Sequence, residues 1–152
     1  MAPQRTAQQA RAAVTGAAGD LPRLLSAVER KVSGRLAAAL ESAGSTIEQW
    51  RVLSLLADNR GHTMTELADH ALLPAPTLTK VIDRMVAANL VHRRADENDR
   101  RRVLALLTPR GRRVYRSLQQ TIEQQESDLF SPLADDVDEL RALLTRANQR
   151  LP

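Results

Sequence analysis

The chain has 152 residues, no cysteine and a formal net charge of +4 at pH 7. This length fits one domain, or one domain with a dimerisation extension, and the lack of cysteine excludes a disulfide framework or a thiol switch. No apolar run approaches the roughly 20 residues that a membrane span needs, and residues 1–19 lack the apolar core of a secretory signal. We therefore expect a cytoplasmic protein with no membrane contact and a flexible N-terminal arm over residues 1–19.

Positive charge is unevenly distributed along the chain. Lys31 and Lys80 are the only lysines, so arginine supplies most of the positive charge. Residues 93–116 are dense in arginine, whereas residues 117–140 hold no basic residue and seven acidic ones. Because arginine forms forked contacts with phosphates and guanine edges, the arginine-rich segment is expected to meet an anionic partner.

The first helix is predicted over residues 20–42. Asp20 can accept hydrogen bonds from the free backbone donors of a first turn, and Pro22 is tolerated there. Leucine and valine side chains then recur at helical spacing from Leu21 to Leu40. This pattern predicts an amphipathic helix with an apolar face to bury.

A second helix follows an interruption at Gly44. Two capping boxes fit its start, Ser45 with Glu48 or Thr46 with Gln49, and the sequence leaves both open. The apolar face of this helix includes Trp50, the one tryptophan of the chain. Its periodic pattern ends near Asn59.

Two further helices form a pair separated by a tight turn. Thr63 with Glu66 is another capping box and opens a short helix that ends at Ala71. Pro74 and Pro76 then suit a turn and the first turn of a new helix. The new helix has one apolar face, made by Leu78, Val81, Ile82 and Met85, and one polar face, made by Lys80, Asp83 and Arg84 with Thr77 and Thr79 beside them.

The period changes after Asn89, which tolerates a left-handed helix end. Residues 90–93 and 103–107 are short apolar stretches around a charged turn, which predicts a β-hairpin. Thr108 and Pro109 then start a helix that runs to about Phe130. Ser131 and Pro132 repeat the same signal and are expected to start the last helix.

This order of elements predicts a mainly α (α+β) fold, a winged helix-turn-helix with flanking helices. The segment MTELADHALLPAPTLTKVIDRMVAANLVHRR, followed by ADENDRRRVLALLTPRG, resembles the DNA-binding core of the MarR family of bacterial regulators. The matching positions include Asp99-Arg100-Arg101, Leu107-Thr108 and Gly111, with Thr77, Thr79, Lys80 and Asp83-Arg84-Met85 ahead of them. Two positions depart from the family pattern, Pro74 where a capping Ser or Asp is usual and Asn89 where Gly is usual.

The resemblance implies a homodimer in which residues 20–45 and 108–152 dimerise and residues 46–107 form the DNA-binding module. It implies that the recognition helix enters the major groove of a pseudo-palindromic double-stranded operator and that the hairpin acts as a wing. The function implied is transcriptional regulation, as a repressor released by a small molecule. The expected DNA contacts are Thr65, Pro76, Thr77, Thr79, Lys80, Arg84, Asp99, Arg100, Arg101 and Arg102.

An effector cleft is also implied, between the dimerisation helices and each DNA-binding module. Arg23 and Trp50 are its candidate residues, although an exposed arginine and a core tryptophan explain them as well. No cofactor or metal is expected, because the acidic turn Asp96-Glu97-Asn98-Asp99 lacks a matching downstream ligand. His62, His70 and His92 are scattered and are expected to be surface or hydrogen-bonded histidines.

Two other classes of protein are weighed against this interpretation. An enzyme is not expected, since no nucleophile with a base, phosphate-binding glycine loop or metal site is visible. An architectural protein that binds DNA without sequence preference has similar electrostatics and stays open as the alternative. A binding competition between operator DNA and non-specific DNA discriminates an architectural protein from a sequence-specific regulator.

Overall fold

The structure is a computed structural model that describes residues 20–97, 99 and 101–151. The predicted arm over residues 1–19 and Arg100 of the wing lie outside the described residues. The chain divides into two compact units, residues 1–35 and residues 36–152. The first long helix contributes to both units.

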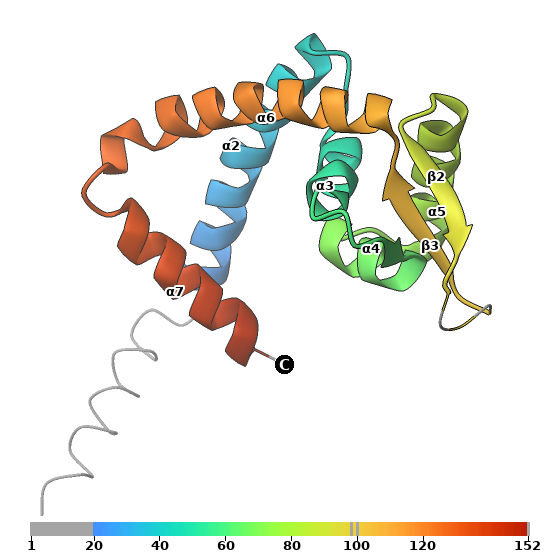
Figure 1. Ribbon diagram of the computed structural model, residues 1–152. Helices are drawn as coiled ribbons and strands as arrows, with labels where there is room; N and C mark the ends of the chain where they lie inside the picture. Colours follow the sequence, from blue (N-terminus) through green and yellow to red (C-terminus); the bar gives the residue numbers. More distant parts are fainter. Residues whose placement is uncertain (1–19, 98, 100, 152) are drawn as a thin grey trace, which may run out of the picture. The chain divides into compact units, whose positions relative to one another are not determined.

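Six α-helices, one 3-10 helix and three short strands make up the described residues (Figure 1). They are α2 (Asp20–Ser42), α3 (Ile47–Leu56), β1 (His62–Thr63), α4 (Met64–Ala71), α5 (Ala75–Ala87), β2 (Val91–Ala95), β3 (Val103–Leu107), α6 (Pro109–Phe130), η1 (Ser131–Leu133) and α7 (Val137–Arg150). The fold class, mainly helical with a small antiparallel sheet, is as the sequence predicts. No helix in the described part of the chain is long and apolar enough to cross a membrane.

The helix starts confirm three of the predicted caps. Thr46 caps α3 by accepting from the Gln49 N–H, so of the two boxes that the sequence left open it is the second that forms. Thr63 caps α4 in a complete capping box, and Thr108 caps α6 by accepting from the Gly111 N–H. In each case a hydroxyl satisfies a backbone donor that the first helical turn leaves free.

Two predicted helix boundaries differ from the structure, and the first strand of the hairpin, expected over residues 90–93, runs from Val91 to Ala95. The helix expected to end near Asn59 ends at Leu56, and Asn59 then adopts a left-handed φ of 62°. The last helix does not start at Ser131-Pro132, which lie in a 3-10 turn, but at Val137. The Ser131 hydroxyl donates back to the Asp128 carbonyl oxygen of α6, 3.1 Å away, so it serves the end of one helix and not the start of the next.

A single core holds the second unit together. Side chains from the last turns of α2 and from α3, α4, α5, α6 and the sheet are buried in it, with Leu40, Leu53, Leu67 and Ile82 fully inaccessible. Figure 1 shows α5 beside the β2–β3 hairpin, which runs away from the start of α6. The core thus fixes α5 and the base of the hairpin in one body and leaves the hairpin turn outside it.

The hairpin gains a third strand that the sequence did not predict. The sheet order is β1-β3-β2, all antiparallel, with Val91 opposite Leu107 and Ala95 opposite Val103. β1 contributes only two residues, and His62 pairs with Ala105 of β3. This small strand attaches the hairpin to the start of α4.

Candidate nucleic-acid interface

The exposed face of α5 carries the polar residues that the sequence assigned to it. Leu78, Ile82 and Met85 are fully buried. The polar side of the helix is exposed, namely Pro76, Thr77, Thr79, Lys80, Asp83 and Arg84. The predicted division of this helix into a core face and a solvent face is therefore confirmed.

The two ends of α5 are held without side-chain caps. Pro74 occupies the N-cap and offers no side-chain hydrogen bond, and its carbonyl oxygen accepts from the N–H groups of both Thr77 and Leu78 at 2.9 and 3.0 Å. At the other end Asn89 has a φ of 56°, the left-handed conformation expected of it. At the start of α5 the backbone of Pro74 therefore accepts hydrogen bonds in a turn where a capping Ser or Asp side chain is usual.

An ion pair that the sequence did not reveal connects α5 to the wing. The Arg93 guanidinium of β2 donates to the Asp83 carboxylate of α5 at 2.7 Å. Both side chains are partly exposed, so the pair contributes little to stability. Its effect is geometric, because it sets two opposite charges against each other and joins α5 to the hairpin.

The hairpin turn is closed by its own backbone and by Asp99. The Asp96 N–H donates to the Arg102 carbonyl oxygen, and the Arg102 N–H donates to that of Asp99, both at 2.9 Å. The Asp99 carboxylate accepts from the backbone N–H of Arg101 at 3.0 Å. Asp99 therefore holds the turn through the backbone of Arg101.

The wing arginines differ in their surroundings. Arg101 and Arg102 are both exposed. The positive charge of Arg102 is close enough to Glu66 of α4 to contribute to lowering the pKa of that carboxyl. Arg94 of β2 has a long ion pair of 3.9 Å with Glu97. These positions place arginines on the hairpin turn and on the strand that leads into it.

The start of α4 is tightly hydrogen-bonded and carries Thr65 on its exposed side. The Glu66 carboxylate accepts from the Thr63 N–H at 2.7 Å and from its hydroxyl at 2.9 Å, and these bonds hold the pKa of Glu66 below its ordinary value. The His62 ring lies 2.9 Å from Asp58. Burial raises the pKa of the Asp58 carboxyl, but hydrogen bonds from the Arg60 backbone and the His62 ring outweigh burial and lower it.

Among the described residues no group of three or more His, Asp or Glu side chains is arranged to hold a metal ion. The Nε2 atom of His70 lies 3.3 Å from the Ser54 hydroxyl, and His92 is exposed on β2. Burial is the main cause that lowers the pKa of His70.

The two candidate effector residues have different environments. Trp50 of α3 is half-buried and stacks on Tyr115 of α6, with ring centroids 5.4 Å apart and planes inclined by 9°. Arg23 of α2 donates to the Asp20 carboxylate through Nε at 2.9 Å and Nη2 at 2.6 Å, a pair within one helix. Tyr115, the one tyrosine, was not singled out from the sequence, because only the packing of α3 on α6 brings it to Trp50.

Comparison with known proteins gives consistent matches. The sequence model of the MarR family matches residues 45–103. The HTH-type transcriptional regulator FarR of Neisseria gonorrhoeae is 35% identical over 86 residues, which cover 57% of this chain and 59% of FarR. The match thus spans about three-fifths of the length of this curated relative.

Solved structures match over more of the chain. The MarR family transcriptional regulator SPO1453 from Silicibacter pomeroyi DSS-3 is 32% identical with a TM-score of 0.77, covering 88% of this chain and 96% of that one. A cysteine-to-serine mutant of MarR from E. coli in complex with operator DNA is 29% identical with a TM-score of 0.75, covering 88% and 95%. NadR in complex with 4-hydroxyphenylacetate is 26% identical with a TM-score of 0.72, covering 84% and 91%.

Proposed function

Because the chain belongs to the MarR family of transcriptional regulators, we propose that it binds a specific double-stranded DNA operator in the cytoplasm as a repressor and that a small molecule releases it. The observation that carries this proposal is the exposed face of α5, with Lys80 and Arg84, beside a hairpin bearing Arg101 and Arg102. A helix of this width fits the major groove, and guanidinium groups suit phosphates and the narrow minor groove. The solved MarR–operator complex supports the assignment by analogy of fold.

Lys80 is the residue on which we base the test of base reading. It is exposed at the centre of α5, on the face opposite Ile82. If it reads a base edge, Lys80→Ala lowers affinity for the cognate site by about 1–3 kcal/mol and relaxes the preference at one position. Fluorescence-anisotropy titrations on cognate and scrambled duplexes separate this from a phosphate contact, which would give an equal loss on both and a shallower salt dependence.

In the wing we propose that Arg101 enters the minor groove and that Arg102, with Arg100, contacts phosphates. The hydrogen bond from the Arg101 backbone to Asp99 gives Asp99 a positioning role in the turn. Asp99→Ala should therefore weaken DNA binding even though it removes a negative charge. Glu97→Ala is the matched control, since it removes a charge from the same turn without touching that hydrogen bond. Tighter binding by both variants would mean that the wing acts only as a patch of charge.

We propose that α2, α6 and α7 form the dimer interface, and that residues 46–107 are the DNA-binding module. α2 has 23 residues but buries only Leu40, and α7 buries none of its 14. Their large apolar side chains stay exposed, for example Leu21 at 63% and Leu144 at 47%. Stripes of this kind must be covered, and a second copy covers them by two-fold symmetry.

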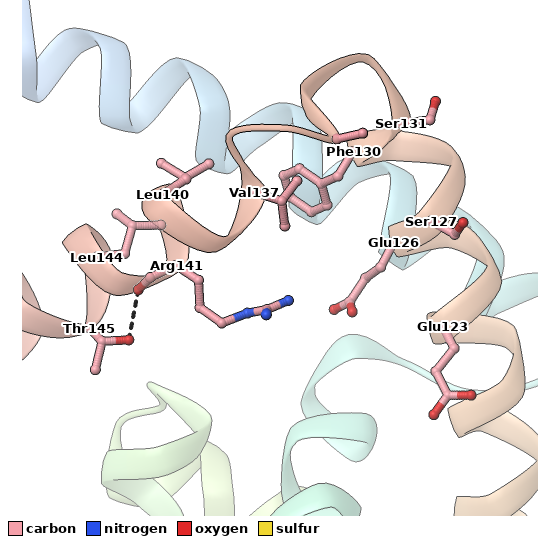
Figure 2. A pocket seen from close by; sticks show the side chains of 11 residues that line it. Glu123, Glu126, Ser127, Phe130, Ser131, Val137, Leu140, Arg141, Leu144 and Thr145 are labelled. Carbon is pink, nitrogen blue, oxygen red and sulfur yellow. Dashed lines mark hydrogen bonds between the residues drawn. The ribbon is translucent and has the colours of Figure 1, made fainter.

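One part of the proposed interface, a groove between α6 and α7, lies entirely within residues 36–152. It has a volume of about 750 Å³ and is lined by Phe130, Val137, Leu140 and Leu144. The side chains of Arg141 and Glu126 point toward one another between the two helices (Figure 2). We assign it to the partner copy, whose apolar helix face would fill it. Sedimentation should show a dimer at micromolar concentration, and a stable monomer would refute the assignment. In the proposed dimer the two recognition helices would lie about 34 Å apart, which is one DNA turn, on a pseudo-palindromic operator.

We propose that the effector binds next to the stack of Trp50 in α3 on Tyr115 in α6. NadR binds 4-hydroxyphenylacetate, and a small aromatic or anionic compound is the corresponding ligand class here. Because Trp50 is the one tryptophan, binding should quench or shift the intrinsic fluorescence. An effector that releases DNA without changing this fluorescence would move the site elsewhere.

The architectural alternative makes a different prediction for the same binding experiment. Both proteins bind DNA with strong salt dependence, because both neutralise phosphates. A specific regulator prefers its operator over random DNA by a factor of about 10³ or more. Competition with unlabelled random duplex measures that ratio, and a value near one would support the architectural function instead.

A further inference from the structure

The exposed stripe of α5 combines apolar groups with one cation. Pro76, Thr79, Lys80 and Asp83 are spaced i, i+3, i+4 and i+7, so they lie on one face of the helix. All four are exposed. The Pro76 ring and the Thr79 side chain come first along this stripe, and the charged residues follow.

The start of α5 offers few hydrogen-bond donors to DNA. Pro74 and Pro76 have no backbone N–H, and the N–H groups of Thr77 and Leu78 already donate to the Pro74 carbonyl oxygen. Within residues 74–78 this leaves Ala75 as the one backbone donor not engaged in that turn. A helix start usually binds anions through its free N–H groups, and here an apolar surface takes their place.

The side chains further along the stripe are also partly committed. The Thr79 hydroxyl donates to the Ala75 carbonyl oxygen at 3.0 Å, so its proton is used within the helix and its methyl group remains available for contact. The Asp83 carboxylate is paired with Arg93. The apolar groups that this stripe offers to a base edge are therefore the Pro76 ring and the Thr79 methyl, and they lie beside the Lys80 ammonium.

This combination suits one base in particular. In the major groove thymine presents a 5-methyl group beside its O4 acceptor, whereas guanine, adenine and cytosine present hydrogen-bonding atoms but no methyl group. Resting on the proposed operator-binding function, we propose that α5 recognises thymine in each half-site, with Pro76 and the Thr79 methyl packed against the thymine 5-methyl group. Pro76 and Thr79 are thus specificity-determining residues that act through apolar contact.

The test uses the full chain and DNA it selects itself. The protein is first used to enrich a duplex from a library with about 20 randomised base pairs, or two helical turns. Each thymine of the enriched duplex is then replaced by deoxyuridine, which removes only the methyl group. We expect one or two thymines per half-site at which this replacement lowers affinity about four-fold, the value for one buried methyl group.

Variants connect this effect to the two residues. Thr79→Ser removes the methyl and keeps the hydroxyl that bonds Ala75. At an affected thymine, the affinity for the thymine duplex divided by the affinity for the uracil duplex (the thymine-to-uracil ratio) should therefore fall toward one. Thr79→Val keeps a methyl and should preserve the ratio, and Pro76→Ser should reduce it. Thr121→Ser is the matched control, because the Thr121 hydroxyl makes the same kind of bond to the Ser117 carbonyl oxygen on α6. Its ratio should equal that of the wild type.

The outcomes separate this inference from the function on which it rests. If the library yields no preferred sequence, the proposed sequence-specific function fails, and thymine recognition fails with it. If a duplex is enriched but uracil is tolerated at every thymine, specific binding stands and thymine recognition is overturned. A thymine preference that persists unchanged in both Thr79→Ser and Pro76→Ser also overturns it.

Discussion

Gly111, in the first turn of α6, packs against the backbone of Leu90 between α5 and β2 and cannot carry a side chain there. A Cβ atom built on Gly111 would lie 2.0 Å from the Leu90 carbonyl oxygen and 3.2 Å from a methyl carbon of Leu107. The same Leu90 oxygen accepts the Thr108 N–H at 3.0 Å, and the Thr108 hydroxyl lies 3.2 Å from it. Gly111→Ala therefore pushes directly against the backbone that follows α5.

The size of the effect can be worked out from these distances. The new Cβ must retreat from 2.0 Å to beyond 3.0 Å, so α6 must move by about 1 Å, a shift of the kind that overpacking causes at about 1–3 kcal/mol. A movement of this size breaks the bond from the Thr108 N–H, and a buried unpaired donor costs about 1–3 kcal/mol. Alanine returns up to about 1 kcal/mol in helix propensity. We expect a net loss of about 1–5 kcal/mol.

Urea unfolding followed by far-ultraviolet circular dichroism, at one fixed protein concentration, measures this loss. Gly34→Ala in α2 is the control, because nothing within the described residues lies within 4 Å of a Cβ at Gly34. That variant should gain about 0.5–1 kcal/mol, as expected for Gly→Ala inside a helix. A Gly111→Ala protein with the unfolding midpoint of the wild type would refute the reasoning, since the backbone could then yield at no cost.

Three other predictions each concern a single residue. Leu72 is 75% exposed with a φ of 57°, so Leu72→Gly should stabilise the chain by about 0.5–1 kcal/mol, and a lower urea midpoint would contradict this. Asp83→Asn should change stability by less than about 1 kcal/mol. It should nevertheless weaken operator binding, because Arg93 loses its charged partner. Tighter operator binding in anisotropy titrations would mean that only the net charge matters. Because the folded pKa of Glu66 is depressed, its contribution to stability is present above the unfolded pKa of about 4.3 and is lost as pH falls through the folded value. Glu66→Gln should therefore reduce the fall in melting temperature between about pH 5 and pH 3, and an identical acid profile would exclude this role for Glu66.

Helices α3 to α6 could be predicted from the sequence because their signals are local. A capping hydroxyl acts on a backbone N–H two or three residues ahead, so Thr63 and Thr108 were assigned correctly without knowledge of their surroundings. The apolar face of α5 and the left-handed Asn89 follow from spacing within one or two turns. Ser131 shows the limit of such signals, since its hydroxyl had two possible partners and donates to the helix behind it.

The contacts that organise the candidate site join residues far apart in the chain, and only the tertiary structure decided them. Strand β1 is two residues long, too short for any periodicity, and exists because His62 pairs with Ala105. The sequence does not indicate which arginine meets Asp83, and the course of β2 brings Arg93 to it. Local hydrogen bonds and side-chain spacing fix which helices and hairpin form, but which side chains meet across them depends on how the buried core sets one element against another.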